Sequence, residues 1–144
     1  MQNLNLPLEW IADTRVGRAV RHASEAHPAT SGVYPLTTSL DAFAARALLM
    51  RAAERTLDIQ CYMWQADITG RLLLFKPLGY LPDFHRLNHR MHNKSLTVDT
   101  QVTIVGGRNV GDAYFGADSE LEFSDLDVIA VGPVAQEVTL AFEA

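Results

Sequence analysis

The residues with the clearest chemical potential lie between positions 92 and 109. They follow an H-x-K-x-x-x-x-D spacing and then a G-G-x-N spacing: His92, Lys94, Asp99, Gly106, Gly107 and Asn109. If this segment begins as a strand, His92 and Lys94 point to the same side and present an imidazole beside an ammonium group. Such a pair suits a phosphodiester, because the ammonium neutralises phosphate oxygens while the imidazole attacks phosphorus or protonates a leaving oxygen.

The residues that follow the pair also suit an anion. Gly106 and Gly107 would let the backbone approach a phosphate closely, and Asn109 can donate a side-chain N–H to it. Asp99 falls at the far end of the expected hairpin, where it is better placed to hold the loop than to take part in chemistry. The segment therefore predicts a phosphate site next to His92.

Helices and strands alternate around this segment. Thr38-Ser39 offers N-cap chemistry for a helix that continues through residues 40–56, with its arginines, Arg46 among them, facing outward. Strands are predicted at 57–64, 95–98, 101–105 and 126–131, and further helices near 13–23, from 70 and from 133. The pattern is that of an α/β fold with a mixed sheet flanked by helices.

One connection in this pattern is short. The helix that begins near Gly70 is stopped by Lys76-Pro77 after little more than one turn. A crossover between parallel strands usually needs a dozen or more residues. We therefore expect this crossover to be too short to return to the sheet, which would leave the sheet incomplete.

Composition and charge restrict the class of protein. The chain has 144 residues, 48% hydrophobic and 20% charged, which fits one globular domain and excludes a disordered polyelectrolyte. It has no apolar run near the roughly 20 residues of a membrane span, and its single cysteine, Cys61, cannot form an internal disulfide.

The net charge is −5, yet residues 71–108 carry six basic and two acidic side chains. A basic segment in an acidic chain indicates a local anion site better than a nucleic-acid surface, although a solvated charged face is an equal alternative. Three further charged residues have simpler interpretations. Arg108 suits either substrate contact or loop solubility, and Asp58 and Asp67 suit surface and capping positions.

The motif resembles the HKD signature of the phospholipase D superfamily and matches it at every defining position. The stretches LDIQCYMWQADITGRLLL, GYLPDFHRLNHRMHNKSLTVD, QVTIVGGRNVGDAYFGA and FSDLDVIAVGPVAQEV are similar to the N-terminal half of bacterial cardiolipin synthases of the C-type subfamily. The resemblance covers residues 32–144, with the motif at about 86–113, and leaves residues 1–31 as an N-terminal extension. It implies a phospholipase D-like lobe.

The resemblance also implies a reaction and roles in it. It implies a phosphatidyltransferase that works through a phosphohistidine intermediate and needs no metal or cofactor. His92, Lys94 and Asp99 are then the catalytic motif residues, and Lys94, Gly106, Gly107 and Asn109 bind the substrate phosphate. Family members orient the histidine with a downstream carboxylate, for which Asp125 is the first candidate and Asp127 the second.

The same resemblance implies partners and a location. The substrates would be phosphatidylglycerol or phosphatidylethanolamine, at the cytoplasmic face of the bacterial inner membrane, to which the protein would bind peripherally. Residues 75–84, with aromatic, leucine and lysine side chains interleaved, suit a membrane interface, although packing on the domain's own core is an equal alternative.

The chain departs from the family in three ways. It carries one HKD motif where the family's active site needs two, it ends before the second lobe, and a helix and strand between GRLLL and GYL are missing. It would therefore act only with a second copy or a second HKD half. The alternatives are a homodimeric phosphodiesterase or nuclease with one motif per chain, and a remnant that binds lipid without turnover. A nucleic-acid substrate is disfavoured by the net charge.

A metal site is a weaker alternative for the histidines. His85, His89 and His92 have the spacing of one helix face, but no carboxylate or thiolate completes a ligand set there.

Overall fold

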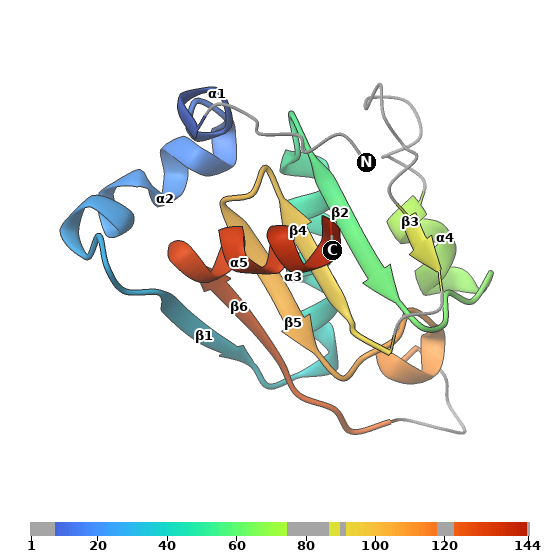
Figure 1. Cartoon of the computed structure of the whole chain (residues 1–144). Coiled ribbons are helices and arrows are strands. Elements are labelled where there is room, and N and C mark those ends of the chain that lie inside the picture. Colours follow the sequence, from blue (N-terminus) through green and yellow to red (C-terminus); the bar gives the residue numbers. More distant parts are fainter. Residues whose placement is uncertain (1–7, 75–86, 90–91, 118–122, 144) are drawn as a thin grey trace.

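The computed structural model describes residues 8–74, 87–89, 92–117 and 123–143 (Figure 1). In this part of the chain a single sheet runs in the order β1-β6-β5-β4-β2-β3. Its strands are β1 (Gly32–Leu36), β2 (Leu57–Cys61), β3 (Leu87–His89), β4 (Ser95–Val98), β5 (Val102–Gly106) and β6 (Asp127–Val131). Neighbouring strands are antiparallel except β2 and β3, which are parallel. The sheet is thus mixed, and the predicted α/β class is confirmed.

The parallel pair corrects one expectation. After α4 (Ile68–Leu74) the chain does return to the sheet, because β3 pairs with β2 from Ile59↔Leu87 to Cys61↔His89. It returns only as a three-residue strand at the sheet edge. The connection itself, and with it the possible membrane-interface segment 75–84, lies outside the described residues.

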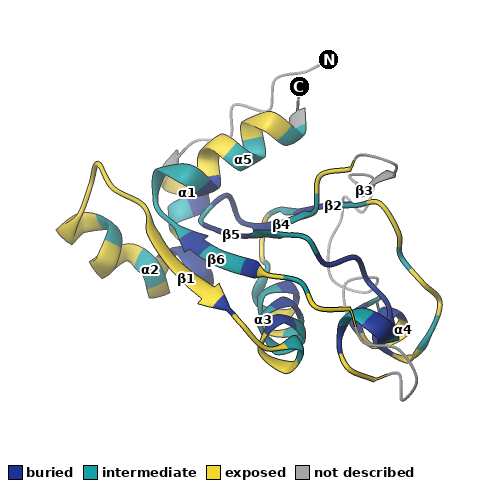
Figure 2. Ribbon diagram, turned by 90° about the horizontal axis from the view of Figure 1, so that it is seen from below, coloured by how far each residue is buried: buried dark blue, intermediate teal, exposed yellow. Residues whose placement is uncertain are grey.

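Helices cover both faces of the sheet. Figures 1 and 2 show α5 (Pro133–Glu143) on one face and α3 (Ser39–Ala52) with α4 on the other. At one end of the molecule lie α1 (Leu8–Ala12) and α2 (Arg15–Ala26), and a short 3-10 helix, η2 (Asp112–Tyr114), follows β5. Among the described residues, no helix is long and apolar enough to span a membrane.

The two faces of the sheet differ in polarity. On the face toward α3, Leu96 lies between Ile59 and Ile104 on the neighbouring strands. These side chains form the hydrophobic core of the domain together with residues such as Met50 of α3. The face toward α5 is polar, and there the hydroxyls of Thr97 and Thr103 lie 2.9 Å apart with both residues buried.

Further polar residues lie on that face, and one of them, Asp58, departs from the sequence-based expectation. Ser95 donates to Gln60 Oε1 at 3.1 Å. Asp58 on β2 is buried as well, so its predicted surface position is wrong: alternation along β2 places it under α5 rather than in solvent.

The helix α3 begins where predicted but presents a different face to the core. Thr38 is its N-cap and accepts a hydrogen bond from Asp41 N. Arg46, expected in solvent, is 6% exposed, whereas Leu40 and Leu48 are 72% and 67% exposed. The apolar residues of α3 are distributed around most of its circumference. Their spacing in the sequence therefore does not identify which side of the helix is buried.

From residue 8 onward the N-terminal extension is largely helical. The helix expected near residues 13–23 is present as α2, with Thr14 as its N-cap and Val16 buried in the main core. The strand β1 was not predicted from the sequence. It pairs with β6 at the sheet edge, where Pro35 is tolerated because an edge strand does not need every N–H.

Candidate active site

Most of the predicted functional residues lie at one end of the central strands of the sheet. Strands β2 and β5 terminate at this end, and β4 and β6 begin there. The register pairs Gly106 with Asp127 and places Cys61 and Lys94 one position beyond the Gln60↔Ser95 pair. We call this end of the strands the HKD edge, which is distinct from the lateral edges of the sheet formed by β1 and β3. The Gly106 N–H donates to the Lys94 carbonyl at 3.2 Å, which ties the start of β4 to the end of β5.

β4 begins at Ser95, as predicted, so His92 and Lys94 precede the strand and the argument that a strand holds both side chains on one face does not apply to them. Strand pairing ends at Ser95, and the Lys94 ammonium donates to the His92 carbonyl at 2.9 Å. The His92 side chain is exposed, with its ring centroid 5.8 Å from that of Tyr62 at the end of β2. The imidazole is therefore open to a substrate, and Lys94 is half-buried beside it.

Beyond the start of β4, the segments that leave β2 and β5 pair with each other. Trp64 and Val110 form an isolated parallel bridge, with Gln65 N donating to Val110 O at 2.9 Å and Val110 N donating to Met63 O at 3.1 Å. The segments that follow β2 and β5 are thus hydrogen-bonded to each other at the same end of the strands as His92 and Lys94.

Asn109 is one of the residues that join these segments. Its Oδ1 accepts from Met63 N at 3.2 Å, and its Nδ2 donates to the Tyr114 hydroxyl at 3.0 Å. The side chain is buried. In this structure Asn109 holds the loop, and its predicted contact with a substrate phosphate stays a prediction.

Asp99 lies at the opposite end of β4 from His92. It is fully buried, and its carboxylate accepts hydrogen bonds from the backbone N–H groups of Glu54, Arg55 and Thr56, at 2.7 to 3.2 Å. Asp99 and Thr100 have φ values of 51° and 57°, in the left-handed region, and Gln101 N donates to Val98 O at 3.0 Å, which closes the tight turn between β4 and β5. The geometry agrees with a loop-holding role for this motif residue.

The glycine pair makes room for two carboxylates of the neighbouring strand. A Cβ on Gly106 would collide with Asp127 Oδ1, and a Cβ on Gly107 would collide with the Asp125 carboxylate. The sequence predicts that these glycines approach a substrate anion. The structure adds that the chain's own acids already approach them, which is why side chains are excluded at both positions.

Asp127 has partners other than His92. Its Oδ2 accepts from Arg46 Nη1 at 3.0 Å and from Arg108 Nη1 at 3.1 Å, and its Oδ1 lies 3.4 Å from Arg108 N. This differs from the second-choice prediction that Asp127 orients the histidine. Asp125, the first choice, lies beside Gly107, and its role toward His92 stays a prediction.

Arg46 is a site residue that the sequence does not predict, whereas for Arg108 substrate contact and loop solubility are both open from the sequence. Both side chains are buried, so neither the solvated helix face expected for Arg46 nor the solvated-loop alternative for Arg108 holds. Arg46 also donates to Ala42 O at 3.0 Å and lies 5.4 Å over the Phe115 ring. The sequence around Arg46 gives no signal for this burial, because the spacing of the apolar residues of α3 does not identify its buried side and the partner carboxylate lies 81 residues away.

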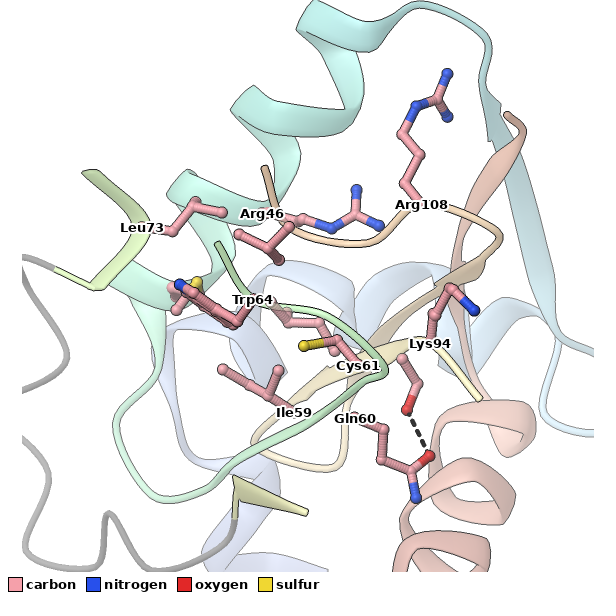
Figure 3. A pocket seen from close by; sticks show the side chains of 12 residues that line it. Arg46, Ile59, Gln60, Cys61, Trp64, Leu73, Lys94 and Arg108 are labelled. Carbon is pink, nitrogen blue, oxygen red and sulfur yellow. Dashed lines mark hydrogen bonds between the residues drawn. The ribbon is translucent and has the colours of Figure 1, made fainter. Parts of the chain in front are cut away.

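A small cavity of about 20 Å³ lies at this edge (Figure 3). Arg46, Arg108, Lys94 and Cys61 contribute to its lining together with apolar residues. The volume suffices for about one water molecule. Burial raises the pKa of the Cys61 thiol, an effect partly opposed by the positive charges of Lys94 and Arg46, so the thiol is protonated and neutral at pH 7.

The described residues offer no metal site. No group of three or more histidine, cysteine or acidic side chains gathers among them. The possible histidine face of a helix is contradicted at residues 87–89, which form β3, while His85 lies outside the described residues.

Comparison with known proteins identifies the class to which this fold and motif belong. No protein-family model matches the chain. Phosphatidylserine synthase of Haemophilus influenzae superposes with a TM-score of 0.63 at 11% identity, over 86% of this chain and 40% of that one. Nuc of Salmonella typhimurium, a phospholipase D family member, gives 0.53 at 14% identity, over 79% of this chain and 91% of that one. These likenesses show that the chain has a phospholipase D fold.

The sequence is similar to the cardiolipin synthases, and with this match the chain is shown to belong to the phospholipase D superfamily. It is 44% identical to Cardiolipin synthase C of Escherichia coli over 86% of this chain, and 32% identical to the major cardiolipin synthase ClsA of Bacillus subtilis over 54% of it. The chain spans 37% of the length of the first relative and 16% of the second.

The first alignment also bears on the internal length of the chain. It runs over 174 positions, whereas the chain has 144 residues. The relative therefore has residues within the matched region that have no counterpart here, which agrees with the shortened connection inferred from the sequence.

Proposed function

We propose that this chain supplies one half of the active site of a phospholipase D-type phosphatidyltransferase, of the kind found in cardiolipin synthases. The observation that carries the proposal is the placement of an exposed His92 and a half-buried Lys94 at one sheet edge. This occurs in a chain 44% identical to Cardiolipin synthase C. The glycine loop and Asn109 lie at the same edge.

The chemistry follows from these side chains. A motif histidine attacks phosphorus, so that a P–N bond forms while the P–O bond to the leaving alcohol breaks, and a second histidine gives that alcohol its proton. The acceptor hydroxyl then loses its proton to the second histidine and attacks phosphorus, which breaks the P–N bond. Lys94 offsets the negative charge on the phosphate oxygens in both steps.

The substrate we propose is a phospholipid, phosphatidylglycerol or phosphatidylethanolamine, at the cytoplasmic membrane surface. Exposed apolar side chains at the HKD edge support a lipid. Tyr62 and Met63 follow β2 and Leu126 precedes β6, and all three are exposed. Such a rim suits the boundary between headgroups and acyl chains.

The second histidine must come from a second HKD motif. A separate HKD half or a second copy of this chain would supply it, since a two-fold axis can bring two copies of one motif together. Nuc supports the second possibility, because the matched region is 91% of that chain. A homodimeric phosphodiesterase with one motif per chain is therefore the alternative function.

The deciding experiment measures product and mass together. Purified chain is mixed with phosphatidylglycerol vesicles, cardiolipin is quantified, and the oligomeric mass is measured by size exclusion with light scattering. We expect turnover by a dimer, at least about 100-fold lower in His92→Ala, and unchanged in His22→Ala, which removes an exposed histidine of α2.

Two results would contradict the proposal. A dimer that cleaves a phosphodiester such as DNA without forming cardiolipin would favour the alternative function. A folded chain that binds vesicles without turnover, alone or with a second HKD half, would identify a non-catalytic remnant.

A further inference from the structure

Two buried guanidinium groups share one buried carboxylate below the HKD edge. The side chains of Arg46, Arg108 and Asp127 are 7%, 2% and 0% exposed, and both arginines contact the same Asp127 oxygen. In the part of the chain that the structure describes, neither arginine forms a second ion pair. This arginine cluster therefore carries one positive charge more than Asp127 neutralises.

Stability alone does not account for the surplus charge. One arginine would neutralise Asp127, whereas burying a second ion costs several kcal/mol in lost hydration. Arg46 recovers part of that cost through Ala42 O and the Phe115 ring. Arg108 recovers less, because its buried Nε has no hydrogen-bond partner. An anion outside the cluster would account for the second cation.

The position of the cluster indicates where that anion binds. Lys94 directly precedes β4, Gly106 ends β5 and Asp127 begins β6, so the three residues follow one another across the HKD edge, and Gly106 has no side chain to separate the other two. With strands about 4.8 Å apart, the cluster lies on the order of 10 Å from the Lys94 backbone. Arg46, Arg108 and Lys94 also line the same small cavity (Figure 3). The surplus charge thus raises the positive potential at Lys94.

We propose that the surplus charge of the arginine cluster strengthens the binding of the phosphate at the HKD edge, with Arg46 and Arg108 as positioning residues that do not touch it. Their field adds to that of Lys94, and Asp127 holds both guanidinium groups in place. This inference rests on the proposed function for the identity of the natural phosphate, but the anion site can be tested without turnover.

The test is titration of the full chain with inorganic phosphate, followed through the NMR signals of His92 and Lys94. Arg46→Gln leaves Asp127 paired with Arg108 and removes the surplus charge together with the guanidinium contacts to Ala42 O and the Phe115 ring. We expect phosphate affinity to fall about tenfold, the effect of one unit charge at this separation in a protein environment. Arg46→Lys keeps the charge and loses the guanidinium contacts, so it should retain most of the affinity.

Arg21→Gln is the matched control, because it removes an arginine charge from the exposed face of α2 and should leave affinity unchanged. Equal affinity in wild type and Arg46→Gln would overturn the proposal, as would an equal loss in Arg46→Gln and Arg46→Lys. Failure of Arg46→Gln to fold would overturn it too, since the second arginine would then be needed for stability.

Lys94→Gln separates this inference from the proposed function. If Lys94→Gln weakens phosphate binding and Arg46→Gln does not, the HKD site stands and the inference fails. If both weaken it but no phospholipid is turned over, the inference stands and the proposed function fails. Absence of phosphate binding in the wild type overturns the inference.

Discussion

At the residue scale, the HKD motif divides between the two ends of β4. His92 and Lys94 lie at the end where the chain's exits from β2 and β5 converge, and Asp99 lies at the other. The aspartate is distant from any substrate bound at His92, because four strand residues of roughly 3.4 Å each separate it from that edge. Its contribution is to the backbone that carries the motif.

Substitution of Asp99 tests this division. Asp99→Ala removes the acceptor for three backbone N–H groups and should lower the free energy of unfolding by about 3 kcal/mol, as measured by urea denaturation. Asp99→Asn keeps one acceptor oxygen and should cost about 1 kcal/mol. Both variants should bind inorganic phosphate as the wild type does. A folded Asp99→Asn that has lost phosphate binding would show that this carboxylate acts at the site itself.

Gly106 gives a second prediction at this scale. Gly106→Ala drives a methyl group against Asp127 and disturbs the arginine cluster, so it should destabilise the chain by at least about 2 kcal/mol in urea denaturation. Gly32→Ala is the control, because its methyl would meet only a flexible Val131 methyl and should change stability by less than about 1 kcal/mol. Equal effects of the two substitutions would contradict the crowding argument.

At the element scale, a pair of carboxylates fastens α4 to the segment after β5. Asp67 accepts from Gly70 N at 2.9 Å and from Asp112 N at 2.7 Å, and Asp112 in turn accepts from Thr69 N at 2.8 Å. The predicted capping role of Asp67 is confirmed. The hydrogen bond from the Thr69 backbone is the main reason that the pKa of Asp112 lies below its ordinary value of 3.8.

This pairing makes the contact between α4 and the segment after β5 sensitive to acid. A carboxylate with a lowered pKa stabilises the folded chain fully above its ordinary pKa, and that stabilisation is lost as the pH falls through the lowered value. Thermal melts between pH 7 and 2.5 should show that Asp112→Asn has a lower Tm than the wild type at neutral pH and loses less of it below about pH 4. Parallel Tm curves for the two proteins would show that Asp112 does not titrate with unfolding.

Elements with local signals were predictable from the sequence, and contacts between distant segments were not. The Thr38 cap, the hairpin at Asp99-Thr100 and the helix that begins at Pro133 all depend on neighbouring residues. The strand β1 was not foreseen because its exposed residues lack alternation and its partner lies about a hundred positions away. The burial of Arg46 likewise depends on a carboxylate 81 residues further along the chain.

At the scale of the whole molecule, α3 and α4 expose large apolar side chains. Ile68 and Leu72 on α4 and Leu48 on α3 are exposed, and β3 has only three residues. The relative from Escherichia coli has additional residues in the matched region, and a helix and strand at this point would bury apolar surface on this side. We therefore expect additional residues placed between α4 and β3 to bury this surface.

Restoring the segment tests this view of the lobe. Inserting the corresponding residues of Cardiolipin synthase C between α4 and β3 should raise the urea midpoint and the m-value together, because m grows with the surface exposed on unfolding. A glycine-serine insert of equal length should raise neither, since a flexible loop adds only closure entropy. The same midpoint with both inserts would show that the segment from the relative adds no stabilising contacts to this sheet. A higher midpoint with the native segment alone would show that the apolar faces of α3 and α4 are the surface on which that segment packs.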